Sequence, residues 1–167
     1  MRFDLKNDGK PGCYSFPLPG SGGAFLVYDV DNDGKIDSGA EMFGTYSPQP
    51  VPMPPGFGPG NGFTALTLFD TNSDTVINNQ DARWSKLKLW KPDHCFSSPD
   101  TPCSALPSEL STLESNGIHS LSLVYRPNDQ TDQWGNHFRF WGELNPLSKN
   151  PDNRAMVDVY LVQGSGK

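Results

Sequence analysis

The most constraining feature of this chain is a short, densely acidic loop between residues 29 and 41. Its sequence, Asp-Val-Asp-Asn-Asp-Gly-Lys-Ile-Asp-Ser-Gly-Ala-Glu, places five carboxylates close together along the backbone. At a separation of ~5 Å and an effective dielectric constant of ~20, each pair of like charges repels by ~3 kcal/mol. A fold that gathers these side chains therefore needs a cation to offset the repulsion.

The spacing of the acids indicates which cation this loop binds. Alternate carboxylates can converge on one centre, and Gly34 permits the sharp turn that wraps an ion. Many hard oxygen ligands on a flexible loop favour Ca²⁺ over Mg²⁺ or Zn²⁺. The predicted metal-binding residues of this loop are Asp29, Asp31, Asp33, Lys35, Asp37 and Glu41. A standard EF-hand has an acid at position 12, where this loop has Ala40, so the loop is EF-hand-like; the alternative is a solvated acidic turn.

A second loop, from residue 70 to residue 81, repeats the pattern with fewer charges. The predicted ligands, at positions 1, 3, 5, 7 and 12, are Asp70, Asn72, Asp74, Val76 (through its carbonyl) and Asp81. Thr75 stands where glycine is usual, which should strain the turn modestly. The alternative is a loop without an ion, held by its own Asx turns.

A third acidic segment, from Asp4 to Gly9, has the outline of the same loop but carries Lys6 at the central ligand position. We expect the ammonium to neutralise the neighbouring acids. This segment is therefore predicted to be a turn that binds no metal.

Composition and charge narrow the classes of protein. A chain of 167 residues is long enough for one domain with a real core, and we expect a single domain over residues 1–167. The net charge of −6 argues against a nucleic-acid partner, which needs a basic face. No apolar run approaches the ~20 residues of a membrane span.

The three cysteines indicate a covalent cross-link. Turn-forming residues separate Cys95 from Cys103, so a disulfide between these two is the preferred interpretation. His94 leaves a zinc site open as an alternative, although its spacing from the cysteines matches no known finger. Cys13 is left over and is expected to be a small buried hydrophobe.

The periodicity of apolar residues predicts short elements, in keeping with 17 glycines and 16 prolines. Strands are expected at 24–28, 87–90, 118–125, 137–141 and 156–162, and the third and fourth of these should form a hairpin. Helices are expected at 61–69, near 79–84, at 108–116 and as a brief turn at 41–43. The predicted fold class is α+β: one compact domain with an antiparallel sheet, short helices and two EF-hand-like calcium loops.

Several catalytic signatures are absent from the sequence. It contains no Gly-x-Ser-x-Gly elbow, no phosphate-binding glycine-rich loop before a helix, and no His-Glu-x-x-His. The chain is therefore not expected to be an enzyme.

The run from Ala24 to Gly44 resembles the "FLxxDxNGNGxIDxGxELFG" signature of calcium-binding modules in secreted bacterial proteins. Such modules include the calcium-dependent self-processing module of RTX toxins. The resemblance continues in order through segments 61–66, 70–74, 81–84, 87–90 and 108–113, so it covers most of residues 3–126. It implies a Ca²⁺ cofactor, a secreted or cell-surface location, and folding that calcium drives or stabilises.

Two departures from the family pattern shape the expected function. Between Lys91 and Leu110 a further acidic loop is missing and the two cysteines stand in its place, so we expect a disulfide to substitute for an ion. Self-processing modules cleave an Asp-Pro bond, and this chain has no Asp-Pro dipeptide. We expect a calcium-binding structural or adhesion module of an exported bacterial protein, whose partners beyond calcium are other copies or cell-surface components. The alternatives are Ca²⁺-dependent self-processing, by Asp-Pro cleavage or ligation, and carbohydrate or surface binding.

Overall fold

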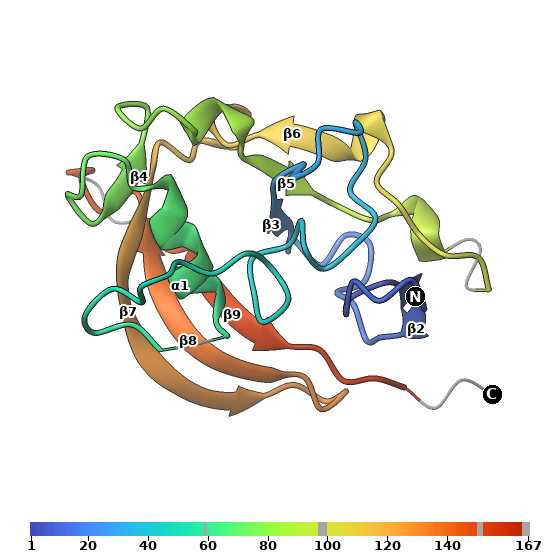
Figure 1. Cartoon of the computed structure of the whole chain (residues 1–167). Coiled ribbons are helices and arrows are strands. Elements are labelled where there is room, and N and C mark those ends of the chain that lie inside the picture. The colour runs from blue at the N-terminus through green and yellow to red at the C-terminus, as the bar shows by residue number, and fades with distance from the viewer. Residues whose placement is uncertain (59, 97–99, 150–151, 165–167) are drawn as a thin grey trace.

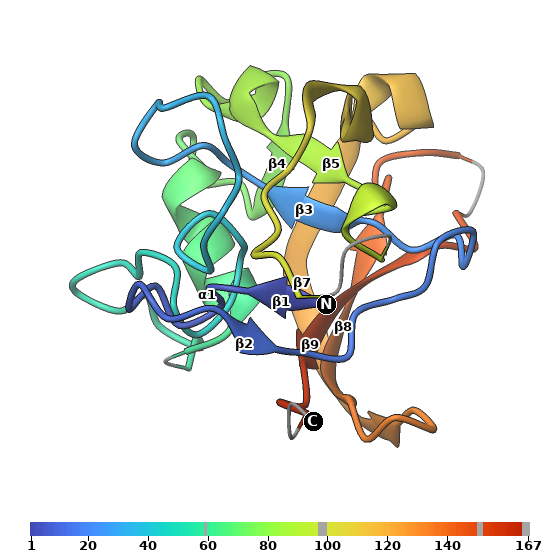
Figure 2. The same cartoon turned by 90° about the vertical axis from the view of Figure 1, so that its right-hand side faces the viewer.

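The computed structural model describes residues 1–58, 60–96, 100–149 and 152–164 (Figure 1). The large sheet forms one side of the molecule, and two smaller sheets lie on the other. Figure 2 shows the smaller sheets in front of strands β7 and β8. All strand pairs within these sheets are antiparallel.

The large sheet has the order β4-β7-β8-β9. Its strands are β4 (Val76–Asn78), β7 (Ser120–Thr131), β8 (His137–Leu144) and β9 (Ala155–Tyr160). The β7–β8 hairpin was predicted from the alternation of apolar and polar residues and is confirmed. Its register shifts between Pro127 and Gln130, as expected where a proline interrupts a strand.

The two smaller sheets contain the first strands of the chain. One has the order β3-β5-β6, formed by Phe25–Val27, Lys88–Trp90 and Leu110–Thr112. The other pairs β1 (Arg2–Phe3) with β2 (Gly12–Cys13). These strands are short because glycine, proline and acidic turns interrupt the chain repeatedly.

Among the described residues, helical structure is limited to short segments. The α-helix α1 spans Gly62–Leu66, and Asn61 caps it by accepting a hydrogen bond from the Thr64 amide at 2.8 Å. The 3-10 turns are η1 (Thr67–Phe69), η2 (Trp84–Lys86), η3 (His94–Phe96), η4 (Pro107–Glu109) and η5 (Glu114–Asn116). Among the described residues no helix is long and apolar enough to cross a bilayer.

The predicted α+β class is therefore wrong, because the fold is essentially all-β. The segment expected as a helix at 108–116 is instead η4, β6 and η5, since Leu110–Thr112 pairs with Lys88–Trp90. The segment near 79–84 is mostly turn, and residues 41–43 form a bridge from Met42 to Val27 rather than a helical turn. Loop 29–41 thus follows strand β3, as predicted, but no helical turn follows the loop, so the EF-hand-like part of the predicted fold class is wrong too.

The buried apolar side chains form two clusters, and the first of them anchors the acidic loop. The first contains Phe3, Val27, Ile36, Met42 and Trp90, among others. The second lies under the large sheet and includes Ile77, Leu87 and Leu121. Val27 precedes the acidic loop, Ile36 lies within it and Met42 follows it, so the first cluster holds the loop at three points.

Candidate metal centre

The structure brings together four of the predicted ligands in the first loop. Asp29, Asp31, Asp33 and Glu41 each offer one carboxylate oxygen, and these oxygens all lie within 4.8 Å of one another. This arrangement can hold a metal ion.

The backbone of this loop explains why the acids converge. Asn32 (φ 59°) and Gly34 (φ 83°) are in the left-handed region, which curls the chain inward. The Gly34 amide donates to Asp29 Oδ2 at 3.0 Å, and the Lys35 amide donates to Asp33 Oδ1 at 2.8 Å. These bonds fix one oxygen of each acid and orient the carboxylate group as a whole.

Glu41 closes the loop from the core side. Its side chain is buried, with only 4% of the residue exposed. Its Oε2 accepts hydrogen bonds from the amides of Asp37 (2.8 Å) and Ser38 (3.2 Å), whereas its Oε1 is buried and has no hydrogen-bond partner. Asp29 Oδ1 is buried and unpartnered in the same way. Two buried, unpartnered carboxylate oxygens in one cluster are costly, and a shared cation would satisfy both.

The electrostatics of the loop agree with this geometry. Burial raises the pKa of Glu41 to about 7, although the amides of Asp37 and Ser38 act in the opposite direction. Burial, followed by the charge of Asp33, also raises the pKa of Asp37. The protein environment alone therefore disfavours these negative charges, as expected where a cation belongs. Oxygen donors of this number and hardness fit Ca²⁺.

The other two predicted ligands of this loop lie outside the group of four. Lys35 is exposed and its ammonium is 3.4 Å from Asp33 Oδ2. Asp37 contributes its amide to Glu41, and its own carboxylate does not belong to the group of four. Their roles as ligands stay predictions.

The second loop is held by its own hydrogen bonds. Asp81 is buried, its Oδ1 accepts from the Thr71 amide at 2.7 Å and its Oδ2 accepts from the Asn78 amide at 2.9 Å. Asp70 likewise accepts from two amides of the loop, at 3.2 and 3.0 Å. In the part of the chain that the structure describes, Asp70, Asp74 and Asp81 do not converge as the acids of the first loop do.

The remaining ligands predicted for this loop are also bonded locally. Asp74 accepts from the Asn72 side chain at 3.0 Å and from the Val76 amide at 2.8 Å. Thr75 has a φ of 67°, so the predicted strain at the usual glycine position is confirmed. The contacts resemble the ion-free Asx-turn alternative, and metal binding by this loop stays a prediction.

The third acidic segment, from Asp4 to Gly9, forms the same turn as the second loop. Its lysine, however, does not contact the residues that were expected. Asp4 accepts from the amides of Asp8 (3.1 Å) and Gly9 (2.8 Å), as Asp70 does in its own loop. Lys6 Nζ, however, donates to Gln163 Oε1 at 3.3 Å. The expectation that Lys6 neutralises the neighbouring acids is therefore wrong, because the lysine reaches toward the C-terminal segment.

The predicted disulfide between Cys95 and Cys103 is confirmed, with Cα atoms 5.5 Å apart. His94 lies beside the two sulfurs, but these are bonded to each other and offer no thiolate for zinc. The turn residues 97–99 lie outside the described residues. Cys13 is free and only half-buried, so it is less buried than expected.

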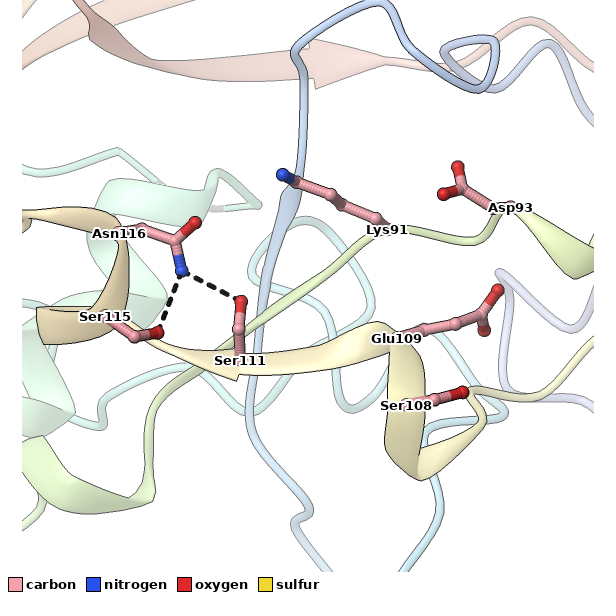
Figure 3. A pocket seen from close by; sticks show the side chains of 7 residues that line it. All are labelled: Lys91, Asp93, Ser108, Glu109, Ser111, Ser115 and Asn116. Atoms are coloured by element: carbon pink, nitrogen blue, oxygen red, sulfur yellow. Dashed lines mark hydrogen bonds between the residues drawn. The ribbon is translucent and has the colours of Figure 1, made fainter.

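An open pocket of about 390 Å³ lies beside the cross-linked region, between β5 and η5 (Figure 3). Glu109 lines it, and its carboxylate accepts hydrogen bonds from Trp90 Nε1 (3.2 Å) and from the amides of His94 (2.8 Å) and Leu106 (3.2 Å). Burial acts to raise the pKa of Glu109, but the hydrogen bonds, chiefly from His94, hold it below its ordinary value. Glu109 therefore anchors the segment where the family pattern has an acidic loop.

Gly39, within the acidic loop, has no room for a side chain. A Cβ at this position would lie 1.8 Å from the Leu5 carbonyl oxygen. The loop thus contacts the N-terminal segment with no room for a side chain. No local pattern in the sequence signals this contact.

The fold and the site together define a β domain with one disulfide and an acidic loop that can hold a metal ion. The chain belongs to the SPM domain family, whose model matches residues 1–162. It is also similar to the iron-regulated protein FrpA of Neisseria meningitidis serogroup C, with 34% identity over 124 residues. The aligned region covers 74% of this chain and 10% of FrpA, so the chain spans about a tenth of that relative's length.

Proposed function

We propose that loop 29–41 binds one Ca²⁺ ion and that the ion stabilises the fold of this domain. The observation that carries the proposal is the buried Glu41 carboxylate, which has an unpartnered Oε1 and offers one oxygen to the cluster with Asp29, Asp31 and Asp33. The ion would replace repulsion between these acids with four attractive contacts.

Calcium binding of this kind contributes directly to folding free energy. For a Kd of ~10 μM, free Ca²⁺ at ~1 mM stabilises the native state by ~2.7 kcal/mol. A typical domain has a total stability of ~5–15 kcal/mol, so one such ion matters. The acids of the unfolded chain are far apart and bind the ion weakly, which makes the effect a stabilisation of the folded form.

The proposal includes export of the protein that carries this domain. The Cys95–Cys103 disulfide supports it, because disulfides persist in oxidising compartments and are rare in a reducing cytosol. Calcium is also far more abundant outside bacteria than inside them. A domain that folds fully only with calcium and a disulfide would reach its final state after export.

The self-processing alternative would need a bond that is not within these residues, because the 167-residue chain has no Asp-Pro dipeptide. The proposed structural role makes no use of such a bond.

The proposal is tested by calorimetric titration of the chelator-treated protein with Ca²⁺, followed by thermal melts in calcium and in chelator. The expected results are a measurable binding heat and a higher melting temperature with calcium. Glu41→Gln should lose most of both effects, whereas the matched change Glu143→Gln, on an exposed strand position, should lose neither. Identical melts of the wild type in calcium and in chelator would refute the proposal.

A further inference from the structure

We propose that calcium in loop 29–41 controls the docking of the N-terminal segment, residues 1–5, onto the domain. The inference rests on the proposed calcium function and adds a mechanical link to it. The link runs from the Glu41 carboxylate, through the backbone of residues 37–39, to the backbone of Asp4 and Leu5.

The contact between the loop and the N-terminal segment is made by backbone atoms at close range. The Gly39 amide donates to the Asp4 carbonyl at 2.9 Å, and Asp4 pairs with Ser38 in a parallel bridge. A Cβ at Gly39 would lie 1.8 Å from the Leu5 carbonyl oxygen and 2.7 Å from its carbonyl carbon. The two backbones therefore fit together only while the 37–39 turn keeps its shape.

Glu41 holds that turn in shape. Its Oε2 accepts from the amides of Asp37 and Ser38, and its own amide donates back to the Ser38 carbonyl at 3.2 Å. The same carboxylate has a buried, unpartnered Oε1 and offers one oxygen to the cluster with Asp29, Asp31 and Asp33. One side chain thus takes part in both the ion site and the turn that grips the N-terminal segment.

The far side of the segment connects to the cross-linked region. The Cys103 amide donates to the Arg2 carbonyl at 2.8 Å, and the Tyr14 amide donates to the Met1 carbonyl at 2.9 Å. Between them Phe3 is fully buried, with its ring 5.5 Å from Trp90 and 5.8 Å from Phe16. Residues 1–5 therefore contain the short strand β1, which carries a core aromatic, and they connect the acidic loop to the disulfide region.

The state of the ion site determines whether this strand stays docked. Without a cation, buried oxygens of Glu41 and Asp29 lie unpartnered among two further acids. Movement of Glu41 toward water relieves this cost and releases the amides of Asp37 and Ser38. The turn then loosens, the Gly39–Asp4 bond weakens, and the strand with Phe3 detaches more often.

The test measures amide hydrogen exchange by NMR in the whole chain, with saturating Ca²⁺ and with chelator. In chelator, exchange at Gly39, Cys103 and Tyr14 should accelerate about tenfold more than at Asn145, which donates to Ser120 of β7 in the large sheet. Equal acceleration at all four amides would mean that calcium acts on the whole fold alone, and the proposed link would be wrong.

A glycine variant tests the link without touching a carboxylate. Gly39→Ala should still bind Ca²⁺, but exchange at Cys103 and Tyr14 should become insensitive to it. Gly44→Ala is the matched control, because nothing lies within 4 Å of a Cβ there, and it should behave as the wild type. Unchanged calcium dependence in Gly39→Ala would overturn the proposal; if that variant does not fold, the wild-type comparison decides.

Calorimetry of the wild type separates the two hypotheses. No binding heat would refute the proposed calcium function itself. Binding heat together with uniform exchange would refute only the link to the N-terminal segment.

Discussion

At the scale of single residues, Glu41 is the most informative position in the molecule. A buried carboxylate with one oxygen bonded to two amides and the other unpartnered is unfavourable alone and favourable beside a cation. Its pKa of about 7, against an ordinary 4.5, has burial as the main cause. The folded protein without calcium therefore prefers a proton on Glu41.

This preference predicts how the stability of the calcium-free protein depends on pH. Because the pKa is raised in the fold, the folded state binds more protons than the unfolded state between pH 4.5 and about 7, and stability falls as pH rises through that window. The loss for Glu41 is at most about 3 kcal/mol. Urea unfolding in chelator at pH 5 and pH 7.5 measures it.

Glu41→Gln should flatten this dependence and make the calcium-free protein more stable at pH 7.5 than the wild type. With calcium the order should reverse, because the glutamine amide attracts the ion less. A variant that is less stable than the wild type under both conditions would contradict this account.

A second prediction at this scale concerns the rank of the two acidic loops. Asp31→Ala removes one of the four converging carboxylates and should weaken calcium binding at least about tenfold. Asp74→Ala should cost less affinity, because its loop is closed by its own hydrogen bonds. Calorimetric titration of both variants compares them, and a larger loss in Asp74→Ala would reverse the ranking.

At the scale of elements, three acidic segments adopt the same turn conformation. Each begins with an aspartate, at positions 4, 29 and 70, that accepts from the amide five residues later. Each also has left-handed residues at the fourth and sixth positions, as Asn32 and Gly34 show for the first loop. The turn forms from local hydrogen bonds, whereas convergence on a metal also requires a closing acid such as Glu41, held by the core.

Helix α1 packs closely against strand β8 at Gly142, so a substitution there tests how tightly the two elements are packed. A Cβ at Gly142 would lie 2.4 Å from Phe63 Cε1, and Phe63 is buried and stacks on Tyr125 at 4.9 Å. Gly142→Ala should therefore destabilise the protein by about 1–3 kcal/mol through overpacking. Urea unfolding measures the change, and Gly44→Ala, with open space around its Cβ, should lie near the wild type. Equal stability of both variants would show that Phe63 repacks freely.

The sequence predicted the correct structure where short local patterns determine it. The alternation of Leu121, Leu123 and Tyr125 predicted β7, and the acidic spacing predicted the converging carboxylates of the first loop. It failed at residues 108–116, where capping signals at Ser111 and Glu114 predicted a helix. There, pairing with β5, which is distant in sequence, overrides a helix preference of a few tenths of a kcal/mol per residue.

At the scale of the whole molecule, the first core cluster joins three stabilising features. Ile36 from the acidic loop, Phe3 from the N-terminal strand, and Cys95 and Cys103 from the disulfide all belong to it. No short window of sequence contains these residues together, so their association could not be predicted from spacing. The cluster therefore packs the acidic loop, the N-terminal strand and the cross-link against one another.

The disulfide's share of this stability can be measured directly. In the chain-entropy model a loop of this size contributes roughly 2–3 kcal/mol, so the double change Cys95→Ser and Cys103→Ser should lower the melting temperature by about 4–12 °C. Thermal melts in calcium measure it. Cys13→Ser should have a much smaller effect, because Cys13 is free and half-buried. A comparable loss in Cys13→Ser would contradict the assigned pairing.

The two end segments of the domain are bonded to each other, and this determines how the molecule responds to pulling. The Gly164 amide donates to the Cys13 carbonyl at 2.9 Å, the Ser15 amide donates to the Val162 carbonyl at 3.1 Å, and Tyr14 pairs with Gln163 between them. Because the pairing is antiparallel, tension that draws Cys13 away from Gly164 loads the bond between them before the bond between Ser15 and Val162. This short ladder therefore opens one bond at a time at low force, instead of shearing all its bonds together.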